Sequence, residues 1–196
     1  MSARLAILLS GGGSTYANLV AAIADGRLRA DIAVVISSRR QVQGVQRARD
    51  NDHPVFVTRD DAEIAALLAS HDASHVAMCG WTRYWDPPPR WRGKVVNIHP
   101  SLLPSFGGRG FYGHHVHAAV LAQGCKLSGC TAHLVQGAYD SGPILVQEAV
   151  PVCPDDDVDS LAARVQAVER AIYPGVVQAL ITDRIREHDG RYWIED

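Results

Sequence analysis

The sequence predicts an α/β protein with a mostly parallel central sheet, helices on both faces of that sheet, and an antiparallel portion toward the C-terminus. In the first half, short apolar runs alternate with helical patterns at the spacing of βαβ units, whose strands are parallel. In the second half, two strand-like runs are separated only by a loop, and a hairpin pattern comes last. The 196 residues are 47% hydrophobic and 20% charged, which suits one domain with a substantial core.

The first half contains strand-length runs separated by helical patterns. Leu5–Leu9 is uninterrupted by polar residues, as in a strand that is buried on both faces. Ala62–Ser70 is rich in Ala and Leu, which favour helices. The expected strands are Leu5–Leu9, Ile32–Ile36, Val55–Val57, His75–Met78 and Val95–Ile98, and the expected helices are Tyr16–Ile23, Val45–Arg49 and Ala62–Ser70.

The second half is expected to begin with a helix and to end with a hairpin. The acidic run Asp155–Asp159 supplies capping residues for a long helix, which Pro174 should kink or interrupt. The expected helices are His114–Gln123 and a helix ending near Thr182, and the expected strands are Cys130–Val135, Ile144–Val152, Arg184–His188 and Arg191–Ile194.

Composition and charge exclude several classes of protein. The formal net charge of −2 gives no basic surface for nucleic acid. No run approaches the ~18–20 apolar residues that span a bilayer, and the first apolar run is too short for a signal peptide. The four cysteines form no C-x-x-C pair. We therefore expect a single domain over 1–196, cytoplasmic, that acts on small anionic metabolites.

Ser10–Thr15 is a glycine-rich turn between the first expected strand and the first expected helix. Glycines permit a tight turn, and free N–H groups at a helix start attract phosphate. The turn lacks the Lys of a Walker P-loop, and Tyr16 stands where G-x-G-x-x-G would need its last glycine. Two interpretations stay open: a phosphate site, or a βα turn capped by Ser14 or Thr15.

Asn97 and His99 are two residues apart on an expected strand, so their side chains share one face. Burying both is costly unless they are hydrogen-bonded or functional. The alternative to a functional site is a hydrogen-bonded pair that finishes the strand, which Pro100 then stops.

The segment VVNIHPSLLP, from Val95 to Pro104, resembles the signature of the folate-dependent formyltransferases, above all those that formylate glycinamide ribonucleotide. Further segments resemble the family in the same order, from Ile7 to about Val177. These segments are Gly11–Thr15, Cys79–Trp85, Asp140–Ile144, Ala163–Gln166 and Glu169–Pro174.

The resemblance implies a Rossmann-like formyltransferase fold with a phosphate-binding half (about 1–95) and a catalytic, folate-binding half (about 96–196). It implies transfer of a formyl group from the co-substrate 10-formyltetrahydrofolate to the amine of 5′-phosphoribosylglycinamide in purine (IMP) biosynthesis, by a monomer or homodimer without a metal. The implied catalytic residues are Asn97, His99 and Asp140. The residues implied to bind phosphoribosylglycinamide are Gly12, Gly13, Ser14, Thr15 and Glu169. The residues implied to contact folate are Thr82, Arg83, Tyr84, Trp85, Asn97, Gln136, Gly137, Ala138, Tyr139 and Asp140.

The implied residues suit the implied chemistry. Attack of an amine on the formyl carbon creates an oxyanion, which Asn97 and a protonated His99 could stabilise. Asp140 beside His99 is expected to raise the pKa of the imidazole. His99 or a water could carry the proton from the amine to the departing folate nitrogen.

Some residues depart from the family pattern. Thr15 and Thr82 stand where Asn and Met are common, and Ser105–His117 is longer than the commonest version. His114, His115 and His117 in that segment lack the i, i+4 spacing of a helical metal site, so no metal is expected.

Several alternatives remain at this stage. A formyltransferase acting on tRNA, on a sugar nucleotide or on a secondary metabolite has a similar core, as does a formyltetrahydrofolate hydrolase. The tRNA and sugar-nucleotide enzymes usually carry added C-terminal structure and the hydrolase an added N-terminal domain, none of which we expect here. A non-catalytic folate- or nucleotide-binding module would need none of Asn97, His99 and Asp140.

Overall fold

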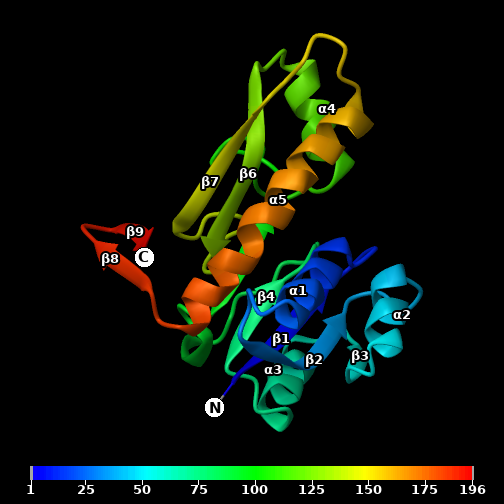
Figure 1. Ribbon diagram of the computed structural model, residues 1–196, viewed down its shortest axis with the longest axis vertical. Coiled ribbons are helices and arrows are strands. Elements are labelled where there is room, and N and C mark those ends of the chain that lie inside the picture. The colour runs from blue at the N-terminus through cyan, green and yellow to red at the C-terminus, as the bar shows by residue number, and fades with distance from the viewer. Residues whose placement is uncertain (1, 196) are drawn as a thin grey trace.

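The computed structural model describes residues 2–195 and has the predicted α/β architecture (Figure 1). One sheet has the strand order β3-β2-β1-β4-β5-β6-β7. Strands β1 to β5 pair in parallel, whereas β6 runs antiparallel to both β5 and β7. The strands are β1 (Ala3–Leu9), β2 (Ala30–Ser37), β3 (Val55–Val57), β4 (His75–Met78), β5 (Val95–His99), β6 (Leu127–Leu134) and β7 (Ile144–Pro151).

Helices cover both faces of the sheet, as predicted. Buried residues of α1, α2, α4 and α5 belong to one hydrophobic cluster, and those of α3 and the 3-10 turn η1 belong to another. The helices are α1 (Ser14–Ala24), α2 (Gln43–Asp50), α3 (Asp61–Ser70), η1 (Pro89–Trp91), α4 (His114–Ala122) and α5 (Val158–Ile181).

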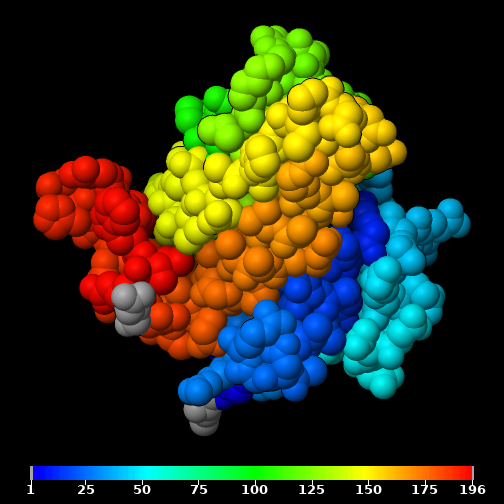
Figure 2. Space-filling view, turned by 45° about the horizontal axis from the view of Figure 1, so that its top comes forward, coloured from blue at the N-terminus to red at the C-terminus, as the bar shows by residue number. Residues whose placement is uncertain are grey.

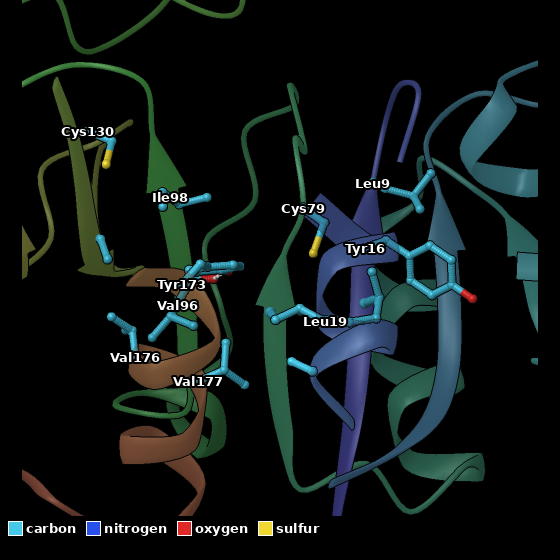
Figure 3. Packing of buried hydrophobic residues seen from close by; sticks show 14 of the residues in the cluster. Leu9, Tyr16, Leu19, Cys79, Val96, Ile98, Cys130, Tyr173, Val176 and Val177 are labelled. Carbon is cyan, nitrogen blue, oxygen red and sulfur yellow. Dashed lines mark hydrogen bonds between the residues drawn. The ribbon is translucent and has the colours of Figure 1, made fainter. Parts of the chain in front are cut away.

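Strand β1 shows how the apolar runs form this double core. Leu5, Ile7 and Leu9 belong to the first cluster, and Ala6 and Leu8 to the second, because successive strand residues point to opposite faces. Figure 3 shows the first cluster, in which side chains of α1 and α5 pack beside the strands.

Helix α5 runs through Pro174, so the expected interruption of the helix does not occur. It begins with a capping box between Asp157 and Ser160 and runs unbroken to Ile181. A proline inside a helix leaves the carbonyl four residues earlier without its N–H donor. Here that carbonyl, on Arg170, accepts a hydrogen bond from Asn18 Nδ2 of α1 at 3.0 Å. The neighbouring helix therefore supplies the bond that the proline cannot make.

Strand β6 begins at Leu127, three residues before the expected start. The sequence Ser128-Gly129 has the composition of a turn, but here Gly129 is needed within the strand. A Cβ at this position would collide with the backbone oxygen of Glu148 on β7. The glycine thus permits close pairing of β6 and β7 from Leu127 onward.

The chain continues past α5 into the expected hairpin of β8 (Ile185–His188) and β9 (Arg191–Ile194). Figure 2 shows it, in red, protruding from the side of the molecule beside β7. Ile185, Tyr192 and Ile194 pack against the first cluster. Within residues 2–195, no helix is long and apolar enough to cross a membrane.

Candidate active site

The candidate site lies where the strand order changes direction, between β1 and β4 and at the end of β5. Ligands of open α/β sheets collect at such a crevice, at the carboxyl ends of the strands. The turns after β1 and β4 are tied together, because the amide of Thr82 donates to Ser10 Oγ at 3.0 Å and the amide of Ser10 donates to Gly80 O at 3.1 Å. The chain thus forms the floor of the crevice from two loops far apart in the sequence.

Asn97 and His99 lie on the last residues of β5 and share one face, as the spacing predicted. The segment that follows is fixed by β6 and β7. Thr131 Oγ1 donates to Ser101 O at 2.7 Å and accepts from the amide of Leu103 at 3.0 Å. Gln147 Nε2 donates to Leu103 O at 2.9 Å. These bonds attach the segment after β5 to both β6 and β7.

His99 and Asp140 face each other, as expected. The Nδ1 atom of His99 lies 3.5 Å from Oδ2 of Asp140, and the side chains have exposures of 4% and 11%, so His99 is buried and Asp140 is partly buried. His99 Nε2 donates to the carbonyl oxygen of Phe106 at 2.9 Å, and the amide of Gly108 donates to Asp140 Oδ2 at 2.9 Å. The long segment after Pro104 therefore braces both members of the pair.

The pKa of His99 is lowered, not raised, which corrects the expectation. Burial disfavours the imidazolium and outweighs the opposing influence of Asp140 and of the Phe106 carbonyl. Burial alone would raise the pKa of Asp140, but His133, His99 and the amide of Gly108 together hold it below its usual range. The pair thus favours an ionised carboxylate beside a neutral imidazole.

His133 belongs to this constellation, although nothing in the sequence singled it out. It lies on β6 directly opposite Asn97. Its Nδ1 donates to the carbonyl of Leu134 at 2.9 Å, so its Nε2 accepts from Asn97 Nδ2 at 3.1 Å. Nε2 also lies 3.6 Å from Oδ1 of Asp140. The sequence does show a histidine inside an apolar strand. Its partner, however, depends on the register between β5 and β6, which the sequence does not reveal.

Two adjoining pockets meet at these side chains. The larger cavity has a volume of about 530 Å³, and the smaller pocket one of about 40 Å³. Trp81, Asn97, Tyr139 and Asp140 line both of them. The larger cavity is also lined by Ser14, Thr15, Gly80, Thr82, Ile98, His99, Pro100, Gly108–Gly113, His117, Gln166 and Glu169.

The smaller pocket brings together the two segments expected to bind folate. Arg83–Trp85 forms one side and Gln136–Asp140 the other, and the rings of Tyr84 and Tyr139 lie 5.3 Å apart. Thr82 departs from this grouping because it lines the larger cavity. Trp85 is buried, so the pocket has an aromatic wall.

The glycine-rich turn has a free helix start, not a side-chain cap. Gly13 precedes α1 with φ of 74°, and no side chain of the described residues caps the helix. Ser14 and Thr15 line the larger cavity, whereas Gly12 and Gly13 do not. A Cβ on Gly13 would lie 2.7 Å from the Cα of Gly44, so the glycine permits the turn to pack against α2. The capped-turn interpretation is therefore wrong.

Glu169 reaches the same cavity from α5. Burial raises the pKa of its carboxyl to about 7, although Arg170 opposes the shift.

The three histidines of the long segment differ in exposure. His117 lines the cavity, whereas His114 and His115 are exposed. No group of side chains suited to a metal occurs among residues 2–195.

Polar side chains shared by two adjoining pockets are typical of an enzyme that brings two small molecules together. A family model described as "Formyl transferase" matches residues 3–177. The chain therefore belongs to the formyl transferase family, as the resemblance implied.

Relatives and solved structures agree with this assignment. The chain is 37% identical to a chloroplastic phosphoribosylglycinamide formyltransferase of Vigna unguiculata, matching 93% of this chain and 62% of that protein. It is 38% identical to a trifunctional purine biosynthetic protein of Drosophila melanogaster, matching 91% of this chain and 14% of that protein. It thus spans less than two thirds of either relative.

The fold is close to that of glycinamide ribonucleotide transformylase 1 from Symbiobacterium toebii, with a TM-score of 0.92 and 32% identity over 100% of this chain and 95% of that one. A formyltetrahydrofolate deformylase from Pseudomonas syringae gives a TM-score of 0.88 at 26% identity, over 100% of this chain and 67% of that one.

Proposed function

We propose that this protein transfers the formyl group of 10-formyltetrahydrofolate to the amine of 5′-phosphoribosylglycinamide, giving formylglycinamide ribonucleotide and tetrahydrofolate. The observation that carries this proposal is the position of Asn97 and Asp140 on the border of two pockets, beside His99. Reactants held in the two pockets would meet at these side chains. The names of the similar proteins from Vigna unguiculata and Symbiobacterium toebii support the same reaction.

The acceptor would occupy the larger cavity. Its phosphate would bind at the free N-terminus of α1, with the hydroxyls of Ser14 and Thr15. Gly12 and Gly13 would act indirectly, by shaping this turn. Glu169 also lines the cavity and would accept hydrogen bonds from the ribose or the amine.

The folate would occupy the smaller pocket. Its pterin ring would lie between Arg83–Trp85 and Gln136–Asp140, where aromatic rings and free backbone groups are available. The formyl group would then point toward Asn97 and the larger cavity.

Asn97 would stabilise the oxyanion. The acceptor nitrogen attacks the formyl carbon, the carbonyl oxygen gains negative charge, and the bond to the folate nitrogen breaks. One N–H of Asn97 is engaged by His133, which orients the amide and leaves the other N–H for the oxyanion. His133 would thus act as a positioning residue.

His99 and Asp140 would carry out the proton transfer. The attacking amine loses one proton and the departing folate nitrogen gains one, so the reaction needs a carrier. The lowered pKa of His99 favours the neutral imidazole, which can accept a proton. Asp140 stays ionised and would stabilise the imidazolium while it exists.

A steady-state assay with both substrates tests the proposal. We expect saturable formation of formylglycinamide ribonucleotide that requires phosphoribosylglycinamide and 10-formyltetrahydrofolate. A folded sample without this activity would overturn the substrate assignment. Activity that is greater with a sugar-nucleotide amine or another amine would move the function to that acceptor.

Hydrolysis of formyltetrahydrofolate is the second candidate, because the structural likeness extends to a deformylase. The large cavity lined by Ser14, Thr15 and Glu169 favours transfer, since hydrolysis needs space only for water. Release of formate in the absence of any amine, at a rate equal to that of transfer, would instead favour the hydrolase.

A further inference from the structure

One histidine of the long segment, His117, lies inside the larger cavity. It is the last residue of that segment and lies on α4, and only 2% of its surface is exposed. Val116 and Val120 of the same helix are buried with it, whereas His114 and His115 face outward. Of the three neighbouring histidines, the helix therefore turns only His117 toward His99 and Asp140, which line the same cavity.

His117 lacks the hydrogen bond that a buried imidazole normally makes. Its Nδ1 atom is buried and has no partner among residues 2–195. The two other histidines buried to this degree, His99 and His133, each bond to a backbone carbonyl. An unpaired buried nitrogen destabilises the folded chain. Because Nδ1 is enclosed, a ligand in the cavity would reach the ring at Nε2, which is not among the enclosed atoms and makes no hydrogen bond within residues 2–195.

The charge of His117 limits what that partner can be. Burial, with the nearby His114 and His99, lowers the pKa of His117 to about 4, so the ring is neutral at physiological pH. A neutral imidazole offers one donor and one acceptor. Such a ring suits a hydroxyl, amide or amine better than a phosphate, and the free helix start beside Ser14 and Thr15 offers the better phosphate site.

We propose that His117 is a binding residue for the formyl acceptor, hydrogen-bonded to an uncharged hydroxyl, amide or amine group of phosphoribosylglycinamide in the larger cavity. This inference rests on the proposed function. It gives the long Ser105–His117 segment a second role: the segment braces His99 and Asp140, and it ends by presenting a ligand-binding ring.

The test compares His117→Leu with His114→Leu. The second variant removes an exposed imidazole from the same helix. The contact of that imidazole with Asp159 is exposed as well. We would measure the melting temperature, the KM of each substrate, and the Kd of phosphoribosylglycinamide by calorimetry without folate. His117→Leu should raise the KM and Kd of the acceptor about tenfold, with the folate KM within about twofold. His114→Leu should leave all these values unchanged.

Stability separates binding from a merely structural role. Because the apolar side chain removes an unpaired buried nitrogen, His117→Leu should melt at or above the wild-type temperature while its acceptor affinity falls. If leucine does not fit and the variant melts early, His117→Phe, which keeps a planar ring, takes its place. His117→Gln, whose amide can reach toward the same group, should recover part of the affinity.

Two results would overturn the inference. One is acceptor affinity within twofold of wild type in folded His117→Leu or His117→Phe. The other is an equal loss of affinity for both substrates. Failure of the proposed function is distinct, because wild-type protein would then show no saturable binding of phosphoribosylglycinamide, and the acceptor named here would be withdrawn with it.

Discussion

The parallel and antiparallel parts of the sheet contribute different things to the candidate site. The part from β1 to β4 contributes turns: a free helix start after β1 and the Gly80–Trp85 segment after β4. The part from β5 to β7 contributes titratable and amide side chains, buried or partly buried, that contact one another from two strands and from the loop after β6. We therefore expect the first part to supply mainly backbone groups for binding, and the second part to supply side chains for the chemistry.

This difference follows from strand pairing. Parallel strands end at one edge, so the turns that follow them gather there and leave backbone groups free. Antiparallel strands place two side chains directly opposite each other, as with Asn97 and His133. Mutations should therefore separate: those of Asn97, His99, His133 and Asp140 should affect turnover, and those in the first turn should affect affinity.

The largest effect is expected for His99→Ala. The variant loses the proton carrier that Asp140 supports, so kcat should fall by ~10²–10⁴ while the Kd of the acceptor changes little. Single-turnover kinetics with saturating substrates measures this directly. Near-wild-type kcat in the folded variant would remove His99 from the chemistry.

Asp140→Asn should reduce kcat about 100-fold and shift the pH profile. In the wild type, kcat/KM should fall as pH drops through the pKa of His99, which burial holds below its ordinary value of 6.5. Asp140 raises that pKa, so its neutralisation should lower the pKa further and move the acid limb to lower pH. An acid limb that stays in place, measured from kcat/KM against pH, would mean that it reports another group.

His133→Leu should reduce kcat about tenfold and leave both KM values within about threefold. The variant removes the acceptor that orients the Asn97 amide but leaves Asn97 in place. Combining His133→Leu with Asn97→Ala should cause little loss beyond that of Asn97→Ala alone. Fully additive losses would contradict a role that acts through Asn97.

The smallest change in activity is expected for Gly13→Ala, compared with Gly26→Ala. Both glycines have positive φ, but only at Gly13 would a Cβ meet Gly44, whereas Gly26 faces open space. Each variant should lose roughly 1 kcal/mol of stability in urea denaturation from backbone strain, with a greater loss at Gly13. Only Gly13→Ala should raise the acceptor KM, by several-fold. Equal kinetic effects at both positions would argue against a binding role for the first turn.

The sequence predicted most of the fold because its strands and helices are locally encoded. Uninterrupted apolar runs such as Leu5–Leu9 and a clear capping run at Asp155–Asp159 need no knowledge of distant residues. The continuity of α5 through Pro174 was not predictable in this way. The carbonyl that Pro174 leaves free is bonded by Asn18, which lies 152 residues away from Arg170 in the sequence.

The site, too, could be predicted from the sequence only in part. The spacing of Asn97 and His99 placed both on one face, and the resemblance supplied Asp140. His133 was missed because the β5–β6 register decides its partner. The lowered pKa of His99 was missed because the depth of burial, which outweighs the charge of Asp140, cannot be seen in a sequence.

The most direct test of the division between the two parts is the Kd of phosphoribosylglycinamide for the Asn97→Ala/His99→Ala double variant, measured by calorimetry beside its turnover. The account predicts a Kd within about threefold of wild type, because Ser14 and Thr15 of the first turn are intact, and kcat lower by at least ~10³. Loss of acceptor binding together with turnover, in a variant that melts like the wild type, would contradict it.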